Sequence, residues 1–196
     1  IIKTIIDEED KGPVNHEYIV QVRVYYYDTE DLLTGSELRT LSYEFEGVTD
    51  ERLKETMQFT VRKNGVYTIY AETYNGSMTD FILVIDNIDM EDPFVQVLKE
   101  MTVYTESLDF FNPKSEIFVY DNVSEGTNIK VELNYYGAKK INGVIDMNRN
   151  PLTDKLSEEE KLVDAKAYLY TVRDLVIRYT VTDEAGNSVE IDSYVH

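Results

Sequence analysis

The residues Asn64 to Gly76, which read N-G-V-Y-T-I-Y-A-E-T-Y-N-G, constrain the fold of this chain most strongly. Asn-Gly favours a tight turn, and the Val, Tyr, Thr and Ile between the two Asn-Gly pairs favour an extended strand. A related string, R-Y-T-V-T-D-E-A-G-N-S, stands at Arg178 to Ser188. The return of a strand-and-turn unit about a hundred residues later is typical of tandem β-sandwich modules rather than of one larger fold.

Length and composition agree with two ordinary domains. The chain has 196 residues with 42% hydrophobic and 29% charged residues, which is normal for a folded protein. It contains no cysteine, which excludes disulfides, thiolate metal sites and cysteine nucleophiles. It begins at Ile1 rather than at Met, so we expect an excised or processed chain whose targeting signals have been removed.

The charge of the chain excludes some classes of binding partner. A formal net charge of −19 repels phosphates and anionic lipids, so we expect no nucleic-acid partner and no binding to membrane surfaces. No run approaches the ~20 apolar residues that span a bilayer, so we expect no membrane insertion. Divalent cations and basic proteins remain as possible partners. The alternative is an acidic surface that only interacts with solvent.

Two boundaries of similar composition divide the chain. Residues 1–6 and 81–85 are apolar runs, and each is followed by an acidic stretch and then by Pro13 or Pro93. We therefore predict two modules, residues 1–90 and 91–196, joined by a short acidic linker.

Alternation of apolar and polar residues predicts mostly antiparallel strands in both modules. Asn64–Gly65 and Asn75–Gly76 are strong hairpin signals. One helix is expected to start at Ser157, because S-E-E-E at 157–160 forms a capping box, and to lie in an insertion at about 140–172. The predicted strands are residues 18–27, 41–46, 57–62, 66–71, 78–85, 94–98, 117–120, 129–136, 175–182 and 188–195.

The string Gly65-Val-Tyr67-Thr-Ile69-Tyr-Ala71 resembles the penultimate strand of immunoglobulin-like domains, G-x-Y-x-C-x-A. The resemblance implies that Tyr67 is the corner tyrosine and that Ile69 fills the usual cysteine position. The strings at 119–126 and 179–187 are similar to the D-N-x-D-G and T-D-x-A-G-N turns of hyalin-repeat-like bacterial modules. The chain thus resembles tandem bacterial Ig-like modules of Gram-positive surface proteins, and the fold implied is all-β, with two Ig-like sandwiches and a short helical insertion in the second.

Two acidic segments could bind calcium. Asp146, Asn148, Asn150 and Asp154 have the spacing of oxygen ligands in an EF-hand-like loop that precedes a helix, although Pro151 replaces the required Gly and position 12 is Ser157. The linker acids Asp86, Asp89, Glu91 and Asp92 resemble the calcium-binding junction of cadherins. The alternatives are a polar loop that caps its own backbone and a solvated linker.

No nucleotide-binding, zinc-protease or serine-hydrolase motif occurs in the sequence, so we expect that this protein is not an enzyme. Exposed tyrosines among residues 25–27 and 135–136 could stack on sugars. A Lys–Asn isopeptide crosslink is also possible, but the sequence does not indicate which residues would form it. The function expected is a non-catalytic stalk or adhesive segment of an extracellular or cell-surface protein from a Gram-positive-type bacterium, beside neighbouring Ig-like modules. The alternatives are a carbohydrate-binding accessory module and a calcium-stabilised adhesion module; the protein or glycan ligand is not identified by the sequence.

Overall fold

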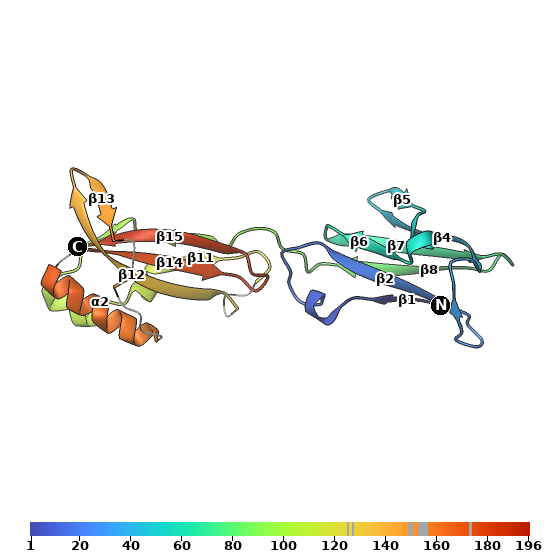
Figure 1. Ribbon diagram of the computed structural model, residues 1–196, viewed down its shortest axis with the longest axis horizontal. Coiled ribbons are helices and arrows are strands. Elements are labelled where there is room, and N and C mark those ends of the chain that lie inside the picture. The colour runs from blue at the N-terminus through green and yellow to red at the C-terminus, as the bar shows by residue number, and fades with distance from the viewer. Residues whose placement is uncertain (125, 127, 149–150, 153–156, 173) are drawn as a thin grey trace. The chain divides into compact units, whose positions relative to one another are not determined.

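The computed structural model describes residues 1–124, 126, 128–148, 151–152, 157–172 and 174–196 (Figure 1). These residues form two compact units, Ile1–Met90 (unit 1) and Glu91–His196 (unit 2). Unit 1 has one hydrophobic core, and the residues that form the cores of unit 2 all come from unit 2. Each unit is therefore described by itself.

Unit 1 is a sandwich of two antiparallel sheets. In the first sheet, β2 (Tyr18–Tyr25) pairs with β1 (Ile2–Ile5), β3 (Leu32–Leu33) and β6 (Gln58–Val61). The second sheet has the order β5 (Val48–Asp50), β4 (Leu38–Phe45), β7 (Gly65–Thr73) and β8 (Met78–Ile85). A 3₁₀ turn, η1 (Glu8–Asp10), and one helical turn, α1 (Leu53–Thr56), lie in the connections.

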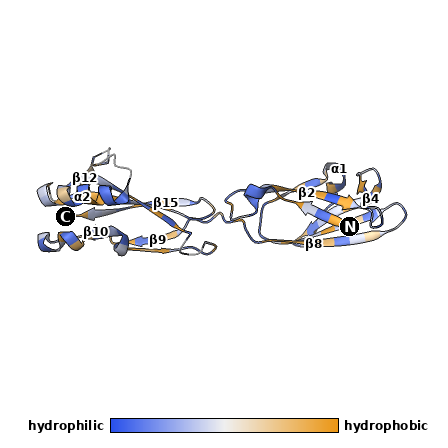
Figure 2. Ribbon diagram, turned by 90° about the horizontal axis from the view of Figure 1, so that it is seen from below, coloured by the Kyte–Doolittle hydropathy of each residue, from blue (hydrophilic) through white to orange (hydrophobic). Residues whose placement is uncertain are grey.

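The core of unit 1 follows from the alternation of its strands. Along β2, Val20, Val22 and Val24 are buried, whereas the residues between them are exposed. Hydrophobic and hydrophilic residues accordingly alternate along this strand (Figure 2). The opposite sheet contributes Leu41 and Ile69, so both sheets fill one core.

The implied tyrosine corner is present in unit 1. The hydroxyl of Tyr67 donates to the Lys63 carbonyl at 2.9 Å, four residues upstream. Ile69 has 0% exposure and packs where the resemblance places a cysteine. The corner therefore forms without a disulfide.

The predicted hairpin at Asn64–Gly65 is wrong. The strands on either side of this turn do not pair, because β6 pairs with β2 whereas β7 pairs with β4 and β8. The turn instead carries the chain from one sheet to the other; a local turn signal cannot select the strand partner. The second Asn-Gly pair does join a hairpin, β7–β8, with Gly76 at φ +85°.

Asn64 instead forms hydrogen bonds that fix the C-terminal end of unit 1. Its side-chain amide donates to the Ile88 carbonyl (2.8 Å) and its oxygen accepts from the Ile88 N–H (2.9 Å). Asn87 similarly donates to the carbonyls of Asp10 (2.6 Å) and Gly12 (2.8 Å). The first half of the predicted linker, residues 86–89, is therefore built into unit 1 rather than solvated throughout.

Replacing Asn64 with alanine is expected to destabilise unit 1 by about 1–2 kcal/mol, because both Ile88 backbone groups lose a partner. The Asn64→Asp variant keeps the acceptor and loses the donor, so its loss should be smaller. Urea unfolding of the three proteins measures the difference. Equal stability of Asn64→Ala and wild type would show that the clamp contributes nothing.

Unit 2 combines a five-stranded sheet with a two-stranded sheet. The larger sheet has the order β10 (Glu100–Met101), β15 (Ser188–Val195), β14 (Leu175–Thr182), β12 (Lys130–Ile141) and β13 (Val144–Met147). All its pairs are antiparallel except β10–β15. The smaller sheet pairs β9 (Phe94–Val97) with β11 (Ile117–Tyr120), and the 3₁₀ turns η2 (Thr105–Phe110) and η3 (Pro113–Glu116) lie between them in the chain.

The hairpin β12–β13 was missed by the sequence analysis although its signal is present. Asn142 and Gly143 both have positive φ, 51° and 82°, as a two-residue hairpin turn requires. Assigning this stretch to a helical insertion concealed it.

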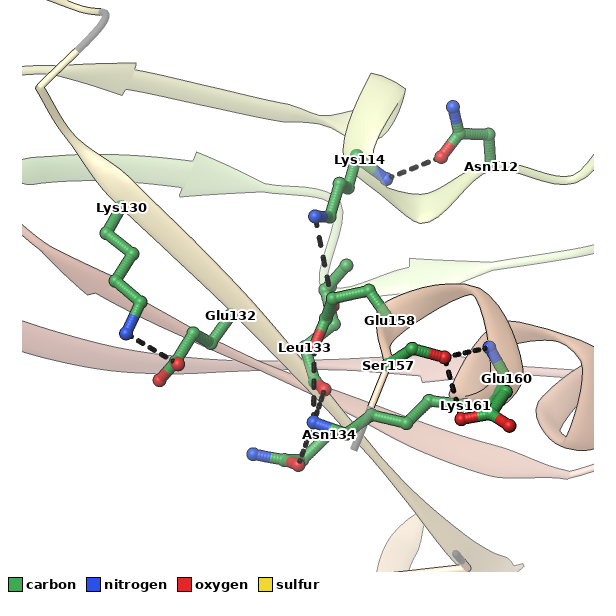
Figure 3. A network of polar contacts seen from close by, with 10 residues as sticks. All are labelled: Asn112, Lys114, Lys130, Glu132, Leu133, Asn134, Ser157, Glu158, Glu160 and Lys161. Carbon is green, nitrogen blue, oxygen red and sulfur yellow. Dashed lines mark hydrogen bonds and ion pairs between the residues drawn. The ribbon is translucent and has the colours of Figure 1, made fainter. Parts of the chain in front are cut away.

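The predicted helix is confirmed as α2 (Glu158–Val172), which buries Ala165 and Leu169. The Glu160 N–H donates to the Ser157 hydroxyl (3.2 Å), which in turn donates to the Glu160 carboxylate (2.8 Å). Figure 3 shows how Lys161, one turn into the helix, reaches the Leu133 carbonyl on β12. The fold is all-β with two Ig-like antiparallel sandwiches, and the second carries this helix.

Candidate functional site

A groove on unit 1 is the candidate site for ligand binding. Two adjoining hollows of about 770 and 310 Å³ lie beside β6. Both are lined by β4, by the segment that follows the β4–β5 hairpin, and by β6. Their shared lining residues are Tyr43, Asp50, Arg52, Thr60 and Arg62.

Aromatic rings line the groove. Tyr43 stacks on Phe59 with ring centroids 4.3 Å apart, and Phe45 stacks on Tyr67 at the same distance. Burial raises the pKa of both Tyr43 and Tyr67 above the ordinary tyrosine value. The phenols are therefore neutral at physiological pH and combine an apolar ring with a hydroxyl.

Charged side chains form the rim of the groove. Arg52 binds Asp50 through two nitrogens, at 2.6 and 3.0 Å. The hydrogen bonds from Arg52 hold the pKa of Asp50 below its usual range. Arg62 pairs with Glu17 at 2.8 Å and Lys63 with Glu46 at 3.9 Å. The rim therefore carries three cations together with three acids, Glu46, Asp50 and Glu51.

The sequence gives no local signal for this groove. Its residues come from β4, β5, β6, β7 and the turns between them, and no motif links them along the chain. Tyr43 and Phe45 alternate as ordinary core residues do, and only the open side of the sandwich makes them a groove lining.

Unit 2 holds a separate pair of carboxylates in its turns. Asp121 follows β11 and Asp183 follows β14; they are 9% and 5% exposed, and their carboxylate oxygens lie within 4.8 Å of each other. Asp121 accepts from the N–H groups of Val123 (2.9 Å) and Ser124 (2.6 Å), so it caps its own turn. Asp183 accepts from the backbone and side chain of Asn187, both at 2.9 Å.

The four predicted linker ligands differ in their placement. Asp89 is buried, at 3% exposure, and its N–H donates to the Val14 carbonyl at 2.8 Å within unit 1. Asp86, Glu91 and Asp92 are exposed. Glu91 accepts from Asn122 at 3.1 Å, which attaches it to the turn that contains Asp121.

The predicted EF-hand-like loop falls partly on a strand. Asp146 lies in β13, opposite Lys139 on β12, and is exposed. The N–H of Asn148 donates to the Gly137 carbonyl at 2.9 Å. Asn150 and Asp154 lie outside the described residues, so these two predicted ligands have no described position.

The tyrosines proposed for sugar stacking separate into surface and core residues. Tyr26 and Tyr27 are 43% and 81% exposed. Tyr135 is 1% exposed and packs in the core of unit 2, so its assignment to a sugar-binding surface is wrong. Strand alternation alone did not say which of Tyr135 and Tyr136 points inward.

Among the residues that the structure describes, Lys161 and Asn134 have the proximity that an isopeptide bond requires. Lys161 Nζ lies 3.3 Å from Asn134 Oδ1 and 3.2 Å from Glu158 Oε1 (Figure 3). It also donates to the Leu133 carbonyl at 3.4 Å. An ammonium that donates to three acceptors has no lone pair available for attack.

We therefore expect an intact mass equal to the sum of the residues. Electrospray mass spectrometry of the purified chain measures it, with Lys161→Arg, which cannot form the bond, as the reference. A wild-type mass lower by one ammonia, absent in Lys161→Arg, would show that the crosslink forms.

Comparison with known proteins identifies no family for this chain. No family model matches the chain, and no curated protein matches it. Among solved structures, the fibronectin(III)-like modules of Clostridium thermocellum CbhA align with a TM-score of 0.36 and 8% identity, over 98% of this chain and 93% of that chain. Within the described residues, no helix has the length and apolar character needed to cross a membrane.

Proposed function

We propose that this chain is a non-catalytic pair of adhesive and structural modules from an extracellular or cell-surface protein of a Gram-positive-type bacterium. The observation that carries the proposal is the construction of two compact units, each around core residues of its own. Modules of this kind serve as spacers that present binding surfaces. Neighbouring Ig-like modules in a longer chain are part of the proposal.

The attachment of the linker supports this role. Asn87 and Ile88 are held within unit 1 by hydrogen bonds to Asp10 and Asn64. Phe94 pairs with Tyr120 within unit 2. Pro93, between these anchors, is buried. Only the few residues between the anchors are left to connect the units, as a tandem module array requires.

Surface labelling tests the proposal. Antibodies raised against the purified chain are applied to intact and to permeabilised source cells, and to the culture supernatant. The proposal expects signal on intact cells or in the supernatant, with a known cytoplasmic protein as the negative control. Signal confined to permeabilised cells would contradict it.

A calcium-stabilised adhesion module is the second candidate, favoured by Asp121 and Asp183. Two carboxylates this close and this little exposed repel each other, and a divalent cation would offset that repulsion. Carboxylate oxygens are the ligands that calcium prefers.

Thermal unfolding in calcium, in magnesium and in EDTA tests this candidate. Saturation at about a hundredfold above Kd should stabilise unit 2 by about 2.7 kcal/mol. Asp121→Asn and Asp183→Asn should remove the effect, whereas Asp80→Asn, an exposed acid on β8, should not. Asp89→Asn and Asp146→Asn are measured in parallel to test the two predicted sites. No response to calcium in the wild type would eliminate all three.

A further inference from the structure

The free edge of β6 carries a further inference, which rests on the adhesive role proposed above. In the part of unit 1 that the structure describes, β6 pairs only with β2, and β5 pairs only with β4. Both hollows of the groove lie beside the other edge of β6. A strand edge that faces open space can accept a strand from another chain.

The ladder shows which groups of β6 face the groove. The Val22 N–H donates to the Met57 carbonyl at 2.8 Å, so these two residues form a hydrogen-bonded pair of the β2–β6 ladder. Because such pairs alternate in an antiparallel ladder, Phe59 and Val61 bond toward β2 while Gln58 and Thr60 turn their backbone groups away.

The two outward-turned residues are not equivalent. The Thr56 hydroxyl accepts from the Gln58 N–H (3.4 Å) and donates to the Gln58 carbonyl (2.6 Å). It occupies both backbone groups of Gln58. Thr60 lines both hollows, and by the alternation of the ladder its N–H and carbonyl point away from β2.

The lining selects the chemistry of an added strand. Side chains of such a strand point alternately to the two faces of the sheet, so every second one would meet the Tyr43 and Phe45 rings. Apolar residues suit those positions. At the rim, the side chain of Arg62 is 73% exposed and its ion-pair partner Glu17 is 54% exposed, so an acidic side chain of the added strand can replace Glu17 beside Arg62. The charge of Asp50 is already offset by Arg52.

We propose that the β6 edge binds an extended peptide segment of a partner protein by strand addition, through the backbone of Thr60. Apolar residues of the segment lie toward Tyr43 and Phe45, and an acidic residue lies toward Arg62. The backbone supplies affinity and the side chains supply selectivity.

Synthetic peptides and NMR test the proposal on the full chain. The probe is the peptide T-V-E-V-E-V-T, and its counterpart T-V-K-V-K-V-T reverses the charge. The acidic peptide should shift the amide signals of Thr60 and Arg62 and leave unit 2 unchanged, and the basic peptide should bind more weakly. Shifts confined to other residues, or equal binding of the two peptides, would overturn the proposal.

Two pairs of variants separate backbone from charge. Thr60→Pro removes the outward N–H without removing a bond to β2, and should weaken binding at least about tenfold, whereas Thr60→Val keeps the N–H and should bind as wild type does. Arg62→Glu should weaken binding about two- to fivefold, the scale of an exposed ion pair, and Arg23→Glu, outside the groove, should not. Signals of unit 2 and of β7 report whether each variant is folded.

A cellulose or chitin oligosaccharide is titrated as the competing ligand class. If it shifts the same amides and Thr60→Pro leaves its affinity unchanged, the groove binds glycans and strand addition is refuted. Surface labelling of cells does not involve the peptide. If the peptide does not bind, the proposed adhesive role still stands; if the labelling places the protein inside the cell, the peptide result still shows whether the β6 edge accepts a strand.

Discussion

Replacing Ile69 with alanine is expected to destabilise unit 1 by about 2–5 kcal/mol, the usual loss for truncating a buried aliphatic side chain. Ile69 is 0% exposed and stands in the middle of β7, between β4 and β8. No disulfide compensates for the lost packing, because the chain has no cysteine. Hydrogen exchange of the backbone amides during unfolding measures the loss of stability of each unit separately.

The control for this variant is Val66→Ala on the same strand. Val66 is 54% exposed, so its truncation should change stability by less than about 0.5 kcal/mol. Since the core around Ile69 contains residues of unit 1 only, unit 2 should keep its wild-type protection in both variants. An equal loss of protection in unit 2 would show that the two units unfold as one and would weaken the modular proposal.

Replacing Gly137 with alanine is expected to destabilise unit 2 by about 1–3 kcal/mol through overpacking. A Cβ at this position would collide with the Tyr168 hydroxyl and lie 2.8 Å from Asn148 Nδ2 and 2.9 Å from Tyr168 Cζ. Gly137 is on β12 and Tyr168 is on α2, so the collision would push the helix off the sheet. Gly126→Ala is the control, because nothing lies within 4 Å of its added Cβ.

A double mutant identifies the cause of that loss. Gly137→Ala combined with Tyr168→Ala should recover part of the stability, because the colliding ring is gone. Denaturant midpoints of wild type, both single mutants and the double mutant give the coupling energy. Strict additivity of the two losses would rule out the contact between β12 and α2 as the reason.

Much of the secondary structure was predictable because it depends on neighbours along the chain. The boundaries of β8, β11, β14 and β15 are those predicted, since alternating apolar residues end there at turn residues. The start of α2 was predictable for the same reason, because a capping box is a contact between residues three apart.

The errors arose where the partner of a segment lies far away in sequence. Asn64–Gly65 has the signal of a hairpin, but β6 pairs with β2, some forty residues earlier, in a register that places Phe59 and Val61 in the same core as the valines of β2. Tyr135 and Tyr136 are adjacent in sequence, and only the packing of α2 onto β12 decides that Tyr135 is the buried one.

The sequence by itself determined the strand-and-turn units and the all-β class, because these rest on backbone preferences and on alternation; the tyrosine corner followed from the resemblance to Ig-like domains. Only the tertiary structure decided that Asn64 holds Ile88, that Asp121 meets Asp183, and that the edge of β6 stays open beside Tyr43 and Arg62. Those contacts join residues far apart in the chain, and the packing of two sheets around one core selects them rather than any local preference.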